Sequence, residues 1–226
     1  MARYPAVVGF SSMTLFARLE NPRGHGHTGR GAKRDCSERL ANMTTGKDMQ
    51  HQETGDVVIR RAVQDDIPAL DAFARGMGQA HEAGYFARCL EEQAAARRQI
   101  FLAIDAASGV LAGYVQLNDY PLYAAFRRFG LPEVQDLNVL PDFRGRGIGA
   151  RLVAYCEDVA RAAGKTEMGI SVGLYASFGA AQRLYVRAGY MPDGAGIAYD
   201  DIPVRAGEMR AIDDNLTLKM TKSLVP

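Results

Sequence analysis

The sequence predicts an α/β domain, of the α+β kind, preceded by a segment of different character. From residue 57 onward, short apolar runs with strand spacing are interspersed with amphipathic helical runs, and two of the strands are joined by a hairpin turn. The strand that ends at Val139 leads through a glycine-rich loop into a long amphipathic helix. With 226 residues the chain is long enough for one or two domains.

Residues 1–55 are expected to form an extension, either disordered or added by an upstream start codon, and residues 56–226 the folded domain. Glycine and polar residues dominate 21–31, and 44–55 has almost no apolar surface to bury.

The first half of the domain is expected to begin with a strand, two helices and a hairpin. Asp65 and Asp66 offer an N-cap for the first helix, and Pro68 suits its first turn. The expected ranges are a strand at 57–62, a second helix at 81–97, and hairpin strands at 99–104 and 110–117.

Residues 118–132 form the longest irregular connection and contain Tyr120, Tyr123, Phe126 and Phe129. Two interpretations stay open here: a loop that contacts substrate, or a short helix that packs its aromatic side chains on the core. Further strands are expected at 168–174, 197–199 and 216–220. The acidic pairs 200–201 and 213–214 lie at turns, where solvation is the favoured interpretation.

The glycine-rich loop, Arg144 to Gly149, is expected to bind an anion. Glycines at 145, 147 and 149 let the backbone approach a ligand, and the helix that follows presents unpaired N–H groups and the positive end of its dipole. Arg144 and Arg146 add formal charge. The spacing G-x-G-x-G differs from the dinucleotide fingerprint G-x-G-x-x-G, and no Gly-Lys-Ser/Thr follows to make a Walker A loop.

Two motifs resemble those of the GCN5-related N-acetyltransferases, the GNAT family. Arg144-x-x-Gly147-x-Gly149 is similar to the family's acetyl-CoA motif, Gln/Arg-x-x-Gly-x-Gly/Ala. Residues 181–190, AQRLYVRAGY, are similar to its A-x-x-L-Y-x-x-x-G-F/Y helix and turn. The resemblance covers about 57–224. It implies the GNAT fold, in which a central mixed, mostly antiparallel sheet is flanked by helices.

The resemblance also implies which residues bind coenzyme A. The loop amides would cradle the pyrophosphate, and the backbone of the preceding strand would hold the pantetheine arm, with the N–H of Val139 polarising the thioester. Many members have Asn where this chain has Phe178, so Ser177 is the expected replacement for that contact. The expected cofactor-binding residues are Leu137, Asn138, Val139, Arg144, Gly145, Arg146, Gly147, Ile148, Gly149 and Ser177.

Acyl transfer from a thioester to an amine needs a base for the amine and an acid for the departing thiolate. Glu133, eleven residues before Arg144, stands where several family members carry a glutamate base; a solvent-facing charge at the strand end is the alternative. Tyr185 matches the family tyrosine near the coenzyme sulfur and is the expected acid, with core packing as the alternative.

The composition of the chain limits the classes of partner that the protein is expected to bind. The formal net charge of +1 gives no support for nucleic acid, no run is long enough to span a membrane, and the chain is expected to be cytoplasmic. Cys36, Cys89 and Cys156 form no metal or nucleophile motif, and the histidines lack fitting partners, so no metal is expected.

The predicted function is acetyl-CoA-dependent N-acetyl transfer to a primary amine, on a small molecule or a lysine side chain, by direct attack in a ternary complex. The alternative is a non-catalytic acyl-CoA-binding or regulatory module on the same fold. Asp119 and Asp201 are expected near the acceptor, which would favour a cationic amine. The family often dimerises, so a homodimer is compatible with the resemblance.

Overall fold

The computed structural model describes residues 51–54, 56–79 and 81–225, and within them a single sheet has the strand order β1-β2-β3-β4-β5-β6-β9-β7-β8. The strands are β1 (His51–Thr54), β2 (Val57–Arg61), β3 (Arg98–Asp105), β4 (Leu111–Asn118), β5 (Glu133–Val139), β6 (Glu167–Gly173), β7 (Met191–Tyr199), β8 (Ile202–Pro203) and β9 (Leu216–Ser223). Among the described strands, β5 and β6 alone pair in parallel, and all other pairs are antiparallel. The predicted mixed, mostly antiparallel sheet is therefore confirmed. The expectation for residues 1–50 lies outside the described residues, whereas 51–54 of the expected extension form β1.

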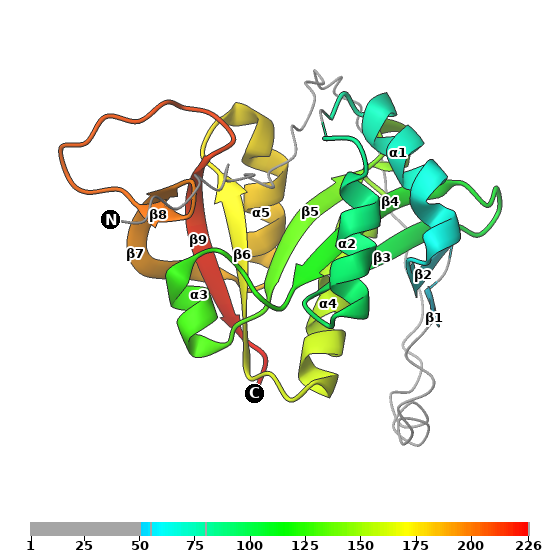
Figure 1. Ribbon diagram of the computed structural model, residues 1–226, viewed down its shortest axis with the longest axis horizontal. Coiled ribbons are helices and arrows are strands. Elements are labelled where there is room, and N and C mark those ends of the chain that lie inside the picture. Colours follow the sequence, from blue (N-terminus) through cyan, green and yellow to red (C-terminus); the bar gives the residue numbers. More distant parts are fainter. Residues whose placement is uncertain (1–50, 55, 80, 226) are drawn as a thin grey trace, which may run out of the picture.

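Helices cover both faces of the sheet (Figure 1). The helices are α1 (Ile67–Gly76), α2 (Tyr85–Ala94), α3 (Ala124–Phe129), α4 (Ile148–Ala162) and α5 (Gly179–Arg187), with short 3-10 turns η1 (Gln64–Asp66), η2 (Pro141–Phe143) and η3 (Ala176–Phe178). Helices α1 and α2 pack on β3 and β4 through one apolar cluster, and α3 packs on the same side near β6; we call this side the front face. Helices α4 and α5 pack on the back face, where they share the largest apolar cluster with the central strands.

Helix α2 differs from its predicted extent, and residues 118–132 take one of the two forms considered for them. Helix α2 is shorter than the predicted 81–97, because Gly84 and Ala96 take positive φ angles of 75° and 55°, which break the helix at both ends. In 118–132 the short-helix interpretation is confirmed as α3, which buries Tyr123 and Phe126 and leaves Phe129 exposed.

Strand β5 contains a bulge that changes which side chains face the front. Val134 and Leu137 both belong to the back-face core although they are three residues apart, so the pairing with β4 shifts by one residue between them. Asp136, at the bulge, has a φ of 48°, a left-handed conformation that aspartate tolerates better than most residues. As a result, Gln135 and Asp136 both point to the front face.

Strands β5 and β6 run side by side for only two residue pairs, Glu133 with Gly169 and Val134 with Ile170. Beyond these pairs the two strands diverge toward their carboxyl ends, as Figure 1 shows, and α5 lies behind the opening. A bulge bends a strand, which accounts for the divergence. Among the strands that the structure describes, none pairs with the second half of β5 on the edge that faces β6.

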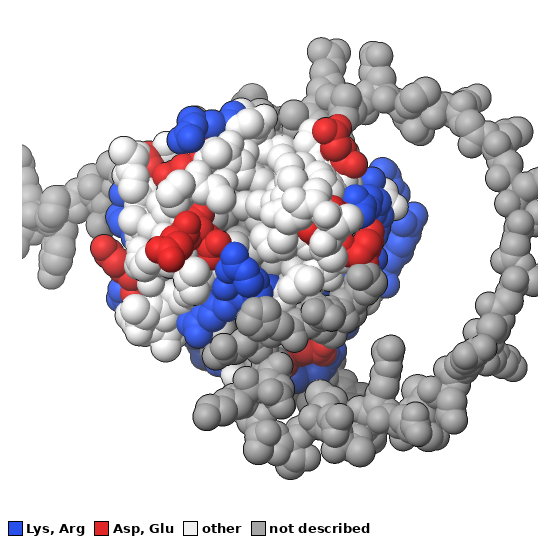
Figure 2. Space-filling model, turned by 90° about the vertical axis from the view of Figure 1, so that its right-hand side faces the viewer, with Lys and Arg blue, Asp and Glu red and all other residues white. Residues whose placement is uncertain are grey.

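The surface on the side of α1 and β2 carries small groups of both charge signs separated by wide uncharged areas (Figure 2). This face offers no extended field of one sign, such as a polyanion would require. None of the helices in the described ranges has the length and apolar character needed to cross a bilayer.

Candidate active site

The glycine-rich loop joins η2 to α4 and is exposed at Gly145, Arg146 and Gly147. Gly145 and Gly147 both have φ angles of 77°, in the left-handed region that favours glycine, and Gly147 is the N-cap of α4. A Cβ atom added to either glycine would meet no atom within 4 Å. Open space therefore lies in front of the loop, where the first N–H groups of a helix of 15 residues are available to an anion.

The loop is tied to the divergent end of β5. Arg144 donates from Nε to the backbone oxygen of Val139 at 3.1 Å. The N–H of Leu140 donates to Ala112 on β4 at 2.9 Å, and successive strand residues alternate, so the backbone groups of Val139 face the unpaired edge. Asn138, by contrast, directs its backbone oxygen toward Gly113 of β4 and its side chain to the front face.

The charge of Arg146 is shared with two carboxylates. Its guanidinium pairs with Asp56 and lies 2.9 Å from Asp105, and Arg151 on the first turns of α4 pairs with Asp56 at 3.0 Å. Hydrogen bonds from Arg146 and Arg151 lower the pKa of Asp56 to about 2. The acidic partners of the loop were not predicted from the sequence.

Gly149 and Ile148 join the loop to the core. Ile148 is buried, and a Cβ on Gly149 would come within 3.4 Å of Leu184 on α5 and 3.8 Å of Leu137 on β5. The third glycine of the loop therefore permits close packing of α4 against β5 and α5.

Tyr185 lies on α5 within the back-face core and is 5% exposed. Burial raises the pKa of the Tyr185 hydroxyl above its usual value, which keeps it protonated at neutral pH. Nearby, Ser177 is half-buried in η3, and Phe178 is buried in edge-to-face contact with Tyr175. Phe178 therefore contributes to packing, and it has no amide group with which to make the contact of the asparagine that many members have.

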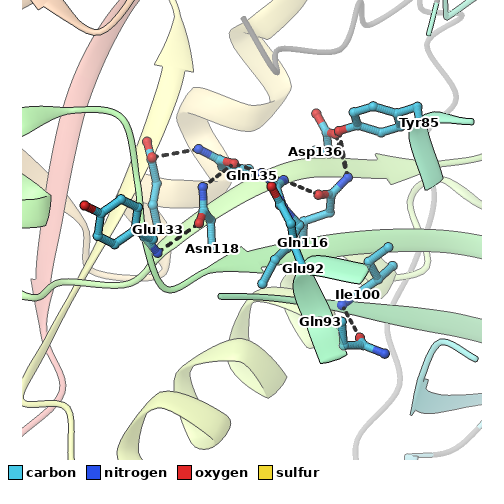
Figure 3. A network of polar contacts seen from close by, with 11 residues as sticks. Tyr85, Glu92, Gln93, Ile100, Gln116, Asn118, Glu133, Gln135 and Asp136 are labelled. Atoms are coloured by element: carbon cyan, nitrogen blue, oxygen red, sulfur yellow. Dashed lines mark hydrogen bonds and ion pairs between the residues drawn. The ribbon is translucent and has the colours of Figure 1, made fainter. Parts of the chain in front are cut away.

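The front face carries a connected set of buried and half-buried polar side chains, which we call the front-face network; Figure 3 shows part of it. It runs between the apolar clusters under α2 and α3, from β4 across β5 and β6 to β9. Its members are Gln116, Asn118, Glu133, Gln135, Asp136, Ser171 and Lys219, joined to Arg98 and Tyr85 at one end.

Glu133 lies inside this network and is only 1% exposed. One carboxylate oxygen accepts from Gln135 at 2.8 Å, and the other accepts from Ser171 and lies 3.5 Å from Lys219 Nζ. The alternative of a solvent-facing charge at the strand end is therefore excluded. The catalytic role of Glu133 stays a prediction.

Asp136 is a site residue that the sequence interpretation missed. Its carboxylate accepts from the Tyr85 hydroxyl at 2.5 Å and from Gln116 Nε2 at 2.8 Å (Figure 3). A signal was present, because the doublet Gln135-Asp136 interrupts the alternation of polar and apolar residues along β5.

Three of the four acidic residues at the turns have partners within the protein, so the solvated interpretation was wrong for them, whereas Asp200 is exposed. Asp201 pairs with the buried Lys219, Asp213 accepts from Tyr199 at 2.8 Å, and Asp214 accepts from Tyr175. The ion pair with Lys219 reduces the negative charge that Asp201 could present to an acceptor amine.

No group of three or more His, Cys, Asp or Glu side chains in the described part of the chain is arranged to hold a metal ion. The two described cysteines, Cys89 and Cys156, are both buried, and burial raises the pKa of each thiol.

Comparison with known proteins places this geometry in a family. The model of the acetyltransferase (GNAT) family matches residues 68–190, more than half of the chain. The chain belongs to the GNAT family. The matched residues include the loop, β5 and α5, so the resemblance seen in the two motifs is confirmed. Acetyl transfer is the class of activity of this GNAT domain. A search of curated proteins gives no match.

Solved structures with the same fold include acetyltransferases that are named for different substrates. The ribosomal-protein-alanine N-acetyltransferase from Brucella melitensis is 20% identical, with 73% of this chain and 98% of that chain covered and a TM-score of 0.55. A phosphinothricin acetyltransferase from Sinorhizobium meliloti, in complex with acetyl-CoA, is 18% identical, with coverage of 74% and 88% and a TM-score of 0.56. An N-acetyltransferase from Staphylococcus aureus is 17% identical, with coverage of 75% and 99% and a TM-score of 0.56. At this identity the likeness concerns the fold alone.

Proposed function

We propose that this GNAT protein transfers the acetyl group of acetyl-CoA to a primary amine by direct attack in a ternary complex. The main observation in support of the proposal is that two features lie at the same place in the fold. The exposed loop at the N-terminus of α4 is hydrogen-bonded to the carboxyl end of β5, and no described strand pairs there with the edge of β5 that faces β6. An anionic, extended ligand is complementary to both.

The coenzyme would be held chiefly by backbone groups. The N–H groups of residues 145–149 are suited to the pyrophosphate, with Arg144 and Arg146 adding charge, and Ile148 and Gly149 fixing the loop on the core. The edge of β5 at Leu137 and Val139 would hold the pantetheine arm as a strand partner does, whereas the backbone of Asn138 faces β4 and is not available for the contact expected of it. Ser177 is the proposed polar contact in place of the absent asparagine.

Tyr185 is the proposed acid for the departing thiolate. Its hydroxyl is protonated at neutral pH, and α5 packs against Gly149 of the loop through Leu184. Glu133, the base that the resemblance implies, has partners within the front-face network at both carboxylate oxygens, which leaves it poorly placed to take a proton from the amine. None of these roles requires a metal ion or a covalent enzyme intermediate.

The acceptor is proposed to be a primary amine, on a small molecule or on a lysine side chain. Such an amine is mostly protonated at neutral pH, so its attack on the thioester requires a base.

The test is calorimetric titration of the full chain with acetyl-CoA, followed by turnover measurements with a panel of primary amines. Gly147→Asp should abolish binding, because it adds a side chain and a negative charge in front of the anion site. Gly164→Asp is the matched control: Gly164 also has a positive φ, 76°, and open space around it, but it ends α4 about 22 Å away along the helix.

The outcomes separate the two functions considered for this fold. Binding lost only in Gly147→Asp, together with turnover, supports the enzyme. Binding without turnover for any amine supports a non-catalytic acyl-CoA-binding module. Unmodified protein that does not bind acetyl-CoA contradicts both functions.

A further inference from the structure

His81, in the connection between α1 and α2, lies beside the bulge of β5. Its ring stacks on that of Tyr85, with centroids 4.1 Å apart and planes 3° apart. Tyr85 in turn donates from its hydroxyl to Asp136 at 2.5 Å, so the stack is anchored on β5. His81 is half-buried, which leaves part of the ring accessible to a ligand.

A chain of hydrogen bonds determines which nitrogen of His81 carries the proton. It begins at Asn138, whose Nδ2 donates to the backbone oxygen of Asp136 at 3.1 Å, so its Oδ1 must act as an acceptor. Gln79 Nε2 donates to that oxygen at 2.8 Å. The orientation of the Gln79 amide is therefore fixed by the strand.

Gln79 Oε1 then faces His81 Nε2 at 3.1 Å and also accepts from the Tyr114 hydroxyl at 3.2 Å. An amide oxygen cannot donate, so Nε2 of His81 must carry the hydrogen. In the neutral ring the basic lone pair consequently lies on Nδ1.

The surroundings also determine the charge of the ring. Burial lowers the pKa of His81 below its usual 6.5, against the opposing effect of the carboxylates of Asp136 on β5 and Asp71 on α1. The hydroxyls of Tyr85 and Tyr114 also lie nearby and are neutral, and they donate to Asp136 and Gln79 and not to the ring. His81 is therefore mostly neutral at pH 7 and able to accept a proton.

We propose that His81 is the general base of the acetyl transfer, accepting a proton at Nδ1 from the attacking amine. This inference rests on the proposed function. As the amine nitrogen forms its bond to the thioester carbonyl carbon, the C–S bond breaks and its electron pair leaves on sulfur. The amine proton passes to His81 and then to solvent, the thiolate takes a proton from Tyr185 or solvent, and the products are the N-acetylated amine and coenzyme A.

Two neighbours act through His81 as positioning residues. Gln79 fixes the tautomer, and Asp136 holds Tyr85, on whose ring His81 stacks. Glu133 differs from His81 because both of its oxygens already have partners within the protein.

The experiment compares His81→Ala and His81→Gln with the unmodified enzyme over pH 5 to 9. Both substitutions should lower kcat about 100-fold or more, with little change in the KM for acetyl-CoA. In the unmodified enzyme kcat/KM should rise with pH through a pKa below 6.5, because the base works only when neutral, and this limb should vanish in both variants. Melting temperatures close to that of the unmodified protein show that the variants are folded.

Other outcomes overturn the assignment. If the His81 variants keep the kcat of the unmodified enzyme and the rise of kcat/KM with pH, His81 is not the base. If Glu133→Gln abolishes that rise instead, the role belongs to Glu133. If the unmodified protein transfers acetyl to none of the amines, the proposed function fails, and the base role with it.

A nitrogen-15 NMR spectrum of the imidazole tests the geometry apart from turnover. At pH 7.5 the hydrogen should be on Nε2 in the unmodified protein. Gln79→Met removes the acceptor and should produce a mixture of tautomers and a smaller loss of kcat than His81→Ala, whereas Gln64→Met, at an exposed glutamine of η1, should change neither. A hydrogen on Nδ1 in the unmodified protein contradicts the proposal.

Discussion

Lys219 on β9 reaches across β6 to Glu133 on β5, with 3.5 Å between Nζ and the carboxylate oxygen, and both side chains are at least 97% buried. The same ammonium pairs with Asp201 and donates to Ser171 at 2.7 Å. A buried charge that loses its partner pays the full desolvation cost.

Lys219→Met should therefore lower the free energy of unfolding by about 3 kcal/mol. Adding Glu133→Gln should recover part of this loss, because the second substitution removes the carboxylate that was left unpaired. Urea unfolding of the two single variants and the double variant measures the coupling. Strictly additive losses would mean that the two charges do not interact.

The acidic partners of the loop arginines should weaken coenzyme binding. Asp56→Asn removes a negative charge that pairs with both Arg146 and Arg151, so the affinity for acetyl-CoA should increase about two- to fivefold at low salt. The gain should shrink as salt screens the exposed charges. Asp158→Asn, which also removes an exposed carboxylate from an arginine but lies further along α4, should leave the affinity unchanged in the same titration.

Tyr185→Phe should lower kcat about 100-fold with unchanged affinity for acetyl-CoA, because the variant keeps the packing of the ring and lacks the acidic hydroxyl. Tyr190→Phe is the matched control, since Tyr190 is also buried and its ring centroid lies 6.3 Å from that of Tyr185. Steady-state kinetics with the best amine of the panel provides the readout. Equal kcat values for the two variants would assign Tyr185 to packing alone.

Gly169 on β6 is required by the close approach of α3. A Cβ at this position would lie 2.4 Å from the buried ring of Phe126, so Gly169→Ala should cost about 1–3 kcal/mol of stability. Phe126→Leu, with a smaller side chain, should make the alanine less costly. Gly76→Ala, at a glycine with open space and no positive φ, should show no comparable loss in the same thermal unfolding experiment.

The order of the strands and helices could be predicted because it depends on local patterns. The loop from Arg144 to Gly149 and the helix containing Tyr185 are continuous in sequence, so their spacing carries the signal. The partners of Glu133 could not be predicted, because Lys219 approaches it only through the insertion of β9 between β6 and β7.

The bulge at Asp136 and the placement of His81 also depend on distant parts of the chain. The doublet Gln135-Asp136 interrupts the alternation of β5, but the residues of β4 at which the register shifts follow only from the pairing of the two strands. His81 is positioned by Gln79 and Tyr85, which are local, but these are themselves held by Asn138 and Asp136 on β5. Sequence patterns identify such residues as polar and do not reveal what they contact.

The extra residue at the bulge of β5 also means that the deletion of one residue could abolish activity. Without Asp136, the strand would regain uniform alternation, and its second half could continue the parallel ladder with β6 that now stops after two pairs. The sheet would then be continuous, and β6 would pair with the edge of β5 that is proposed to bind the coenzyme. A three-nucleotide deletion at this codon is thus enough, in principle, to convert an enzyme into a closed and inert scaffold.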